Sequence, residues 1–157
     1  MKRTPSTRVL RVTASSFAIA WSIALLIFFN FFSDYIAFYH DGMREPFITA
    51  EFNQWLWILN TTLILSVIGH TILLVFDRYI LRESILIVLN IFGIATVATL
   101  LSLFPFDFSL IPNADIVKWT NLGVRIALAL TIAGIGIGTL VSVIRLILNT
   151  TRGTKDY

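Results

Sequence analysis

The residues best able to do chemistry in this sequence are acids and one histidine between positions 34 and 51. Asp34, His40, Asp41, Glu45 and Glu51 offer oxygen and nitrogen ligands of the kind that a divalent cation binds. Their spacing matches no ligand motif, and ordinary solvation of a loop explains the same residues equally well. A cation site is therefore the weaker interpretation, and we expect no metal and no other cofactor.

A second histidine, His70, occurs in an apolar part of the chain together with Asn60, Ser66 and Asn90. Such side chains need partners where no water is available. His70 could take part in an interhelical hydrogen bond, relay a proton or ligate a metal. A relay needs a chain of ionisable groups, and the apolar segments contain no Asp, Glu, Lys or Arg. Hydrogen bonding is therefore the favoured interpretation, and a haem site is disfavoured because it needs paired histidines in the membrane.

The motifs of common enzymes are missing from the sequence. It has no cysteine, which excludes disulfides, thiol redox relays and cysteine-ligated metals. It has no phosphate-binding glycine loop, zinc-protease motif or nucleophile elbow, and no set of acid, base and nucleophile can be assembled from it. The sequence therefore predicts a protein that is not an enzyme, and a lipid-modifying enzyme ranks third among the hypotheses for its function.

Composition indicates the elements that must position these residues. Hydrophobic residues make up 57% of the 157-residue chain, far more than a soluble domain of this size can bury. Four apolar runs are long enough to cross a hydrocarbon core of roughly 30 Å. They cover residues 12–33, 55–76, 85–104 and 126–144. We expect an all-α integral membrane protein: one domain, residues 1–157, with four transmembrane helices in an antiparallel up-down bundle. The first run lacks a cleavage site and is interpreted as a retained anchor.

Basic residues predict the orientation of the chain in the membrane. Three basic residues flank the spans on one side: Arg44, Lys118 and Arg125. Nine flank them on the other side: Lys2, Arg3, Arg8, Arg11, Arg78, Arg82, Arg145, Arg152 and Lys155. Because cytoplasmic flanks carry the excess of Lys and Arg, both termini should be cytoplasmic. The net charge of +3 is then a topology signal rather than a nucleic-acid-binding feature.

The short loop after residue 76 predicts a hairpin of the second and third spans. His70 and Asn90 lie at equal distances from this loop and should face each other, about 10 Å from the cytoplasmic end. By the same count, Asn60 should lie opposite residues 99–102 in the outer half. Both pairs are expected to be interhelical hydrogen bonds of about 0.6 kcal/mol.

The outer side is unusually aromatic. Fifteen of the 21 aromatic residues gather there: Phe28, Phe29, Phe31, Phe32, Tyr35, Phe38, Tyr39, Phe47, Phe52, Trp55, Trp57, Phe104, Phe106, Phe108 and Trp119. Such rings favour the headgroup level, so the favoured interpretation is a belt that fixes the depth of the protein. The alternative is a surface for a lipid tail, a quinone-like ligand or a partner helix.

Two local features concern the last span. Asn113 is expected to cap a helix with Asp115 in its first turn, in a loop that lies along the interface. Arg125 begins the span at the level where Asp34 ends the first one. We expect an ion pair between Asp34 and Arg125 at the outer boundary, with snorkelling of Arg125 to lipid phosphates as the alternative.

Small residues form two stripes on the last span, calculated at 100° per residue. The long groove is formed by Ala127, Thr131, Gly134, Gly138 and Ser142. The short groove, formed by Ala129, Ala133 and Gly136, lies about 180° from it. Small residues let transmembrane helices approach closely. In a square four-helix bundle each helix meets its two neighbours on faces about 90° apart, so grooves on opposite faces cannot both serve neighbours in the chain. We therefore expect the long groove to pack within the chain and the short groove to pack on a second copy or another subunit. The alternatives are a flattened bundle that uses both grooves, or a groove that faces lipid.

Two functional hypotheses follow. The first is a non-catalytic subunit, scaffold or regulator that associates with itself or with a membrane complex through the last span. The second is a small oligomeric transporter or channel lined by Asn60, Ser66, His70 and Asn90. The expected location is the cytoplasmic membrane of a prokaryote, and no nucleic-acid partner is expected.

Overall fold

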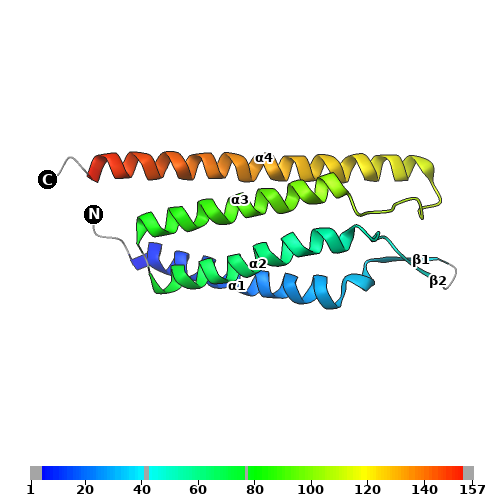
Figure 1. Ribbon diagram of the computed structural model, residues 1–157, viewed down its shortest axis with the longest axis horizontal. Coiled ribbons are helices and arrows are strands. Elements are labelled where there is room, and N and C mark those ends of the chain that lie inside the picture. Colours follow the sequence, from blue (N-terminus) through cyan, green and yellow to red (C-terminus); the bar gives the residue numbers. More distant parts are fainter. Residues whose placement is uncertain (1–4, 41–42, 77, 154–157) are drawn as a thin grey trace.

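The computed structural model describes residues 5–40, 43–76 and 78–153. Each of its long helices is long and apolar enough to cross a membrane, which confirms the four predicted spans. The helices are α1 (Pro5–Phe31), α2 (Phe52–Val75), α3 (Tyr79–Leu103) and α4 (Ala114–Gly153). The start of α1, the end of α4 and the ends of α2 and α3 that the α2–α3 turn joins lie at one end of the molecule. The other ends of the helices lie at the opposite end, which we call the outer end (Figure 1).

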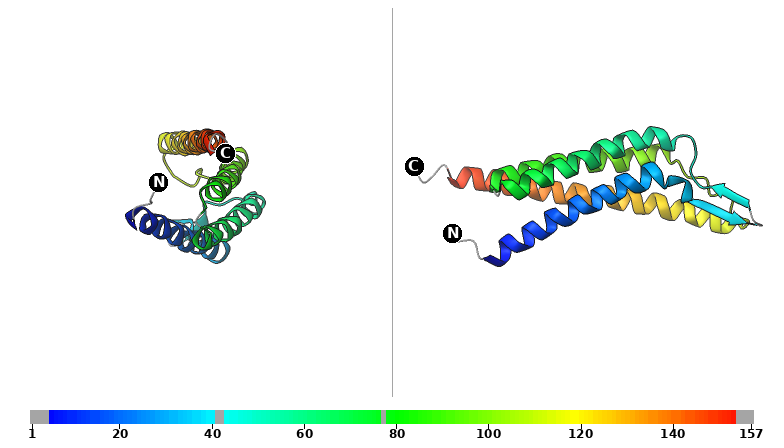
Figure 2. Two further views of the ribbon diagram at one scale, coloured as in Figure 1. Left: turned by 90° about the vertical axis from the view of Figure 1, so that its left-hand side faces the viewer. Right: turned by 90° about the horizontal axis from the view of Figure 1, so that it is seen from below.

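The helices do not form a square bundle. The helix pairs in extensive contact are α1 with α2, α2 with α3, and α3 with α4. Viewed along the helices, the four elements form an open curve with α1 and α4 at its ends (Figure 2). Each terminal helix therefore has one extensive neighbour in the chain, and most of its surface is free.

The buried centre lies in the outer half of α2. Phe52, Trp55, Leu59 and Leu63 form its core, and α1 and α3 contribute partly buried apolar side chains around it. Nearer the other end, α2 and α3 pack closely at Gly69, which is buried. A Cβ atom there would lie 3.0 Å from Cγ2 of Ile85 and 3.1 Å from Cδ1 of Leu89. A methyl group at this crossing would crowd the side chains of α3, which would have to shift by a few tenths of an ångström.

The outer connections contain strands that the sequence did not predict. The strands β1 (Ala37–His40) and β2 (Met43–Pro46) form an antiparallel hairpin. The chain after β2 is joined to the α3–α4 loop by backbone hydrogen bonds from Thr49 N to Pro105 O (3.1 Å) and from Asp107 N to Phe47 O (2.8 Å). These bonds satisfy loop groups at the boundary of the apolar layer and join the two outer connections.

The helix α4 begins at the predicted cap. Asn113 Oδ1 accepts hydrogen bonds from the backbone of Asp115 (2.9 Å) and Ile116 (3.3 Å), and Asp115 lies in the first turn. The helix then continues to Gly153 without a break, so the segment after the cap is not a separate interfacial helix. Its 40 residues extend about 60 Å, roughly twice the thickness of a hydrocarbon core. The helix is therefore longer than this layer is thick, and its outer end reaches the level of the β-hairpin (Figure 1).

Candidate functional site

The face of α4 that packs on α3 consists mainly of bulky side chains. Leu128, Ile132 and Ile135 are half-buried on this face. The Cδ1 atom of Ile135 lies 3.8 Å from the position that a Cβ of Gly93 would occupy on α3. The glycine at this helix crossing thus belongs to α3, and α4 contributes the large side chain.

The long and short grooves of α4 lie to either side of this packed face, each about 90° from its centre. A Cβ added at Gly134, Gly136 or Gly138 would meet nothing within 4 Å. In the long groove Ala127, Thr131, Gly134 and Gly138 are exposed, and only Ser142 is half-buried. Our expectation that the long groove packs within the chain was therefore wrong. The reason is the open arrangement of the helices, in which α4 has α3 as its one extensive neighbour.

The short groove is similarly uncovered. Ala129 and Ala133 are exposed, and Gly136 is half-buried. Both stripes of small residues therefore remain open, and the side of α4 opposite α3 carries large exposed residues such as Leu130 and Ile137. This arrangement gives α4 two surfaces on which another helix could approach closely.

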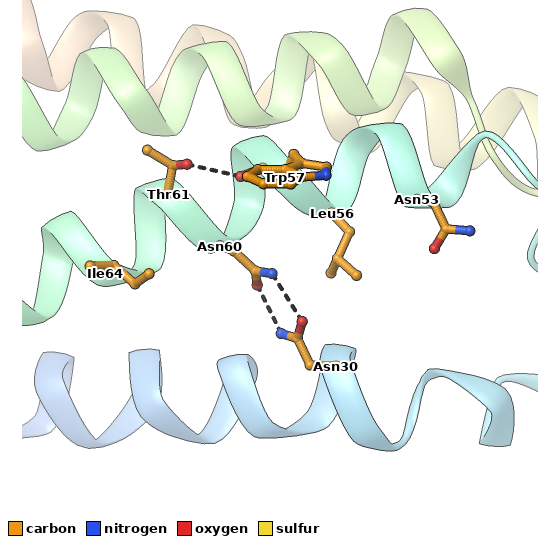
Figure 3. Close-up of a pocket in the computed structure, with 7 residues that line it drawn as sticks. All are labelled: Asn30, Asn53, Leu56, Trp57, Asn60, Thr61 and Ile64. Atoms are coloured by element: carbon orange, nitrogen blue, oxygen red, sulfur yellow. Dashed lines mark hydrogen bonds between the residues drawn. The ribbon is translucent and has the colours of Figure 1, made fainter.

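A second open feature lies between α1 and α2, and we call it the asparagine groove. Its volume is about 580 Å³. Figure 3 shows its lining residues: Asn30, Asn53, Leu56, Trp57, Asn60, Thr61 and Ile64. Asn30 Nδ2 donates to Asn60 Oδ1 at 2.8 Å, and Asn60 Nδ2 donates to Asn30 Oδ1 at 2.9 Å. Asn60 therefore pairs with α1 rather than with residues 99–102 of α3, which corrects our expectation.

Other polar side chains also pair across the helices. Ser22 Oγ donates to Ser66 Oγ at 2.9 Å. This pair lies about two helical turns farther from the outer end than the two asparagines. Between α2 and α3, the hydroxyls of Thr62 and Thr96 lie 2.7 Å apart, and the buried indole of Trp55 donates to Thr96 O at 3.0 Å. Sequence reasoning missed Asn30, Ser22 and Thr62 as partners. Their polar character inside apolar runs was the available signal, but it does not say which helix each one faces.

His70 and Asn90 do not form the predicted bond. They directly follow Gly69 and Leu89, which contact each other across α2 and α3. Both side chains are half-buried, and His70 Nδ1 is buried without a hydrogen-bond partner. No hydrogen bond joins the two residues in the part of the chain that the structure describes. Similar depth is therefore not sufficient for contact, because rotation of each helix decides where its side chains point.

Arg125 interacts with an aromatic ring instead of Asp34. Its guanidinium carbon lies 4.0 Å from the centre of the Phe104 ring. Phe104 follows α3 in the left-handed conformation, with φ of 43°, which costs a non-glycine residue roughly 1–2 kcal/mol. No ion pair between Asp34 and Arg125 occurs among the described residues. Asp34 lies in a short 3-10 turn, Ser33–Tyr35, just after α1, and α1 and α4 lie at opposite ends of the open curve of helices (Figure 2). The predicted pair is therefore replaced by a cation–π contact between the end of α3 and α4.

The outer acids do not gather into a metal site in the described residues, where no group of three potential ligands was found. The side chains of His40 and Asp41 lie outside that part. Two other acids have local partners. The Thr49 hydroxyl lowers the pKa of Glu51, although it makes no hydrogen bond of good geometry. Hydrogen bonds from the Ser109 hydroxyl and backbone lower the pKa of Asp107. These contacts are those of ordinary loop structure.

Comparisons with protein-family models, curated proteins and solved structures found no match. The structure therefore defines the class, a chain of four apolar helices compatible with a multi-pass membrane protein.

Proposed function

We propose that this protein is a non-catalytic membrane subunit that binds another transmembrane helix through α4. One observation carries the proposal. In the described structure α4 packs extensively on α3 alone, and a Cβ atom added at Gly134, Gly136 or Gly138 would have no neighbouring atom within 4 Å. Helix association in lipid depends on close packing, because lipid tails are as apolar as leucine side chains. Glycines that no helix of the chain contacts are thus best explained by a helix from a second copy or another subunit.

The long groove is the better candidate surface. It runs over four turns, from Ala127 to Ser142, whereas the short groove is confined to residues 129–136. The Thr131 hydroxyl donates to Ala127 O at 2.8 Å, so its polarity is satisfied within α4 and presents no obstacle to apolar packing. A scaffold, a regulator or a subunit of a larger complex would all use such a surface.

The test is a comparison of bulky substitutions. Gly138→Leu and Gly134→Leu should leave the monomer folded and weaken association, because they fill the groove without touching the chain's own packing. Ala98→Leu is the matched control, since Ala98 is an exposed small residue on α3. Size exclusion with light scattering gives the mass, and a melting curve gives the stability. Native mass and native melting in both glycine variants would contradict the proposal.

The identity of the partner requires a separate experiment. Gentle purification of the protein from its native membrane, followed by mass spectrometry, should recover one partner with the wild type and lose it with Gly138→Leu. A partner retained by Gly138→Leu and lost by Gly136→Leu would assign the interface to the short groove.

The alternative function, a small oligomeric transporter or channel, has less support. Of the four residues proposed to line a path, Asn60 and Ser66 form hydrogen bonds within the chain. His70 Nδ1 is the observation that favours this alternative, because it is buried and unpaired. If His70→Leu abolished transport in reconstituted vesicles without lowering stability, the transporter hypothesis would replace the subunit hypothesis.

Orientation and location complete the proposal. The distribution of basic residues supports cytoplasmic termini. We propose the cytoplasmic membrane of a prokaryote as the location. Because the chain has no native cysteine, single cysteines can be placed at Ser109 and Ser6. An impermeant thiol reagent added to intact cells should label the first and spare the second. The reverse pattern would invert the orientation.

A further inference from the structure

A second hollow at the outer end shares the lining residue Asn53 with the asparagine groove. This outer hollow has a volume of about 260 Å³. It is lined by Ser33, Asp34, Pro46, Ile48, Thr49, Ala50, Phe52 and Asn53. Asn53 lines both hollows, so a single molecule could extend from the loop region into the apolar layer.

The asparagine groove has unused hydrogen-bonding capacity. A carboxamide has two N–H donors and an oxygen with two lone pairs. Asn30 uses both donors, on Asn60 Oδ1 and on Leu26 O (2.8 Å). Asn60 uses one donor, which leaves one N–H and a lone pair on each carboxamide oxygen. The side chain of Asn53 makes no hydrogen bond to other described residues. These groups lie in one row, since Asn53 and Asn60 are two helical turns, about 10 Å, apart.

The rest of the asparagine groove is apolar. Leu56 and Ile64 line it beside Trp57, whose side chain is 80% exposed. Thr61 Oγ1 donates to Trp57 O at 2.9 Å, so this hydroxyl is already satisfied. The lining therefore suits an acyl chain that has polar groups at its outer end.

The outer hollow carries one acidic side chain. Asp34 is exposed and lines it, and the described lining residues include no Lys, Arg or His. Glu51, whose pKa the Thr49 hydroxyl lowers, lies on the same loop. The Thr49 hydroxyl oxygen is buried and makes no hydrogen bond of good geometry. A cationic group is thus favoured here, and a headgroup with only negative charge is repelled.

We propose that the asparagine groove and the outer hollow together bind a membrane lipid with a primary ammonium headgroup. The ammonium lies at Asp34, headgroup or ester oxygens accept hydrogen bonds from Asn53 and Asn60, and the acyl chain lies along Leu56, Trp57 and Ile64. Charge complementarity selects this occupant over an anionic lipid, and the free carboxamide N–H groups select it over a plain hydrocarbon. The site is on α1 and α2 and is independent of the grooves of α4.

Native mass spectrometry of the purified full chain provides the test, with phosphatidylethanolamine and phosphatidylglycerol of identical acyl chains as probes. The wild type should bind the ethanolamine lipid severalfold more tightly. Asp34→Asn should remove this preference, which is expected to reach about fivefold, the upper end of the range for a partly hydrated ion pair. Glu45→Gln is the matched control, because Glu45 is an exposed outer acid that lines neither hollow, and it should keep the preference.

A second variant separates binding from folding. Asn53 forms no side-chain bond within the described chain, so Asn53→Leu should keep the native melting temperature and weaken both lipids by a similar factor. Equal binding of the two lipids by the wild type would overturn the proposal. Unchanged selectivity in Asp34→Asn would also overturn it. Crosslinking of Asn53→Cys between two copies would show that a second chain, rather than a lipid, occupies the groove.

Discussion

Alanine substitutions at two glycines of different surroundings test the packing of the helices. At Gly69, the new Cβ would lie 3.0 Å from Ile85 Cγ2 and 3.1 Å from Leu89 Cδ1. Ordinary van der Waals contacts of a Cβ atom begin near 3.4 Å, so both side chains must withdraw by a few tenths of an ångström. At Gly138, a new Cβ would meet nothing within 4 Å.

The magnitude follows from two opposing effects. Alanine gains about 1 kcal/mol of helix propensity over glycine at either position. Overpacking at a close contact costs roughly 1–3 kcal/mol. Gly69→Ala should therefore change the free energy of unfolding by about 0 to 2 kcal/mol in the destabilising direction, combining these ranges. Gly138→Ala should stabilise the monomer by up to about 1 kcal/mol.

The assay is thermal or denaturant unfolding of each variant in the same detergent, with helix content measured by circular dichroism. For a chain of this length, 1 kcal/mol corresponds to roughly 2–4 °C. Gly69→Ala should melt below Gly138→Ala by several degrees. If the two variants melt together, or if Gly69→Ala is the more stable, the close approach of α2 and α3 at Gly69 is refuted.

Three further predictions concern named contacts. Asn30→Leu and Asn60→Leu should each lower stability by about 1 kcal/mol, and the double variant should cost less than the sum, because each single change leaves a carboxamide unpaired; strict additivity in unfolding measurements would mean that the asparagines do not pair. Trp55→Phe should destabilise by about 1 kcal/mol through loss of the indole bond to Thr96 O, whereas Trp57→Phe, at an exposed site, should be nearly silent; equal melting temperatures would count against the buried bond. Ser109→Ala should raise the pKa of Asp107, because it removes the hydroxyl that lowers that pKa, and nuclear magnetic resonance titration of the carboxyl carbon measures the change. Since the folded pKa of Asp107 lies below its ordinary value of 3.8, the contribution of this contact to stability is present above that value and is lost as the pH falls through the folded pKa. An unchanged pKa in Ser109→Ala would exclude the hydroxyl as the cause.

The sequence by itself determined the features that depend on local chemistry. The four apolar helices follow from the length and composition of the runs, because only a helix satisfies its own backbone in lipid. The start of α4 follows from Asn113, whose side chain caps the adjacent backbone. Neither conclusion required knowledge of how one helix lies against another.

The tertiary structure alone decided which faces meet. Asn60 was recognisable as a polar residue that needs a partner, but its pairing with Asn30 depends on the rotation of α1 and α2. Hydropathy gives little information about that rotation, since lipid and protein interior are both apolar and leave no polar stripe to mark the outside. Gly69 and the glycines of α4 look alike in the sequence, yet one lies at a helix crossing and the others lie open. The difference arises from the open curve of helices, in which α4 has one extensive neighbour and α2 has two. Close packing of neighbouring helices, rather than hydrophobicity, determines which helix faces meet.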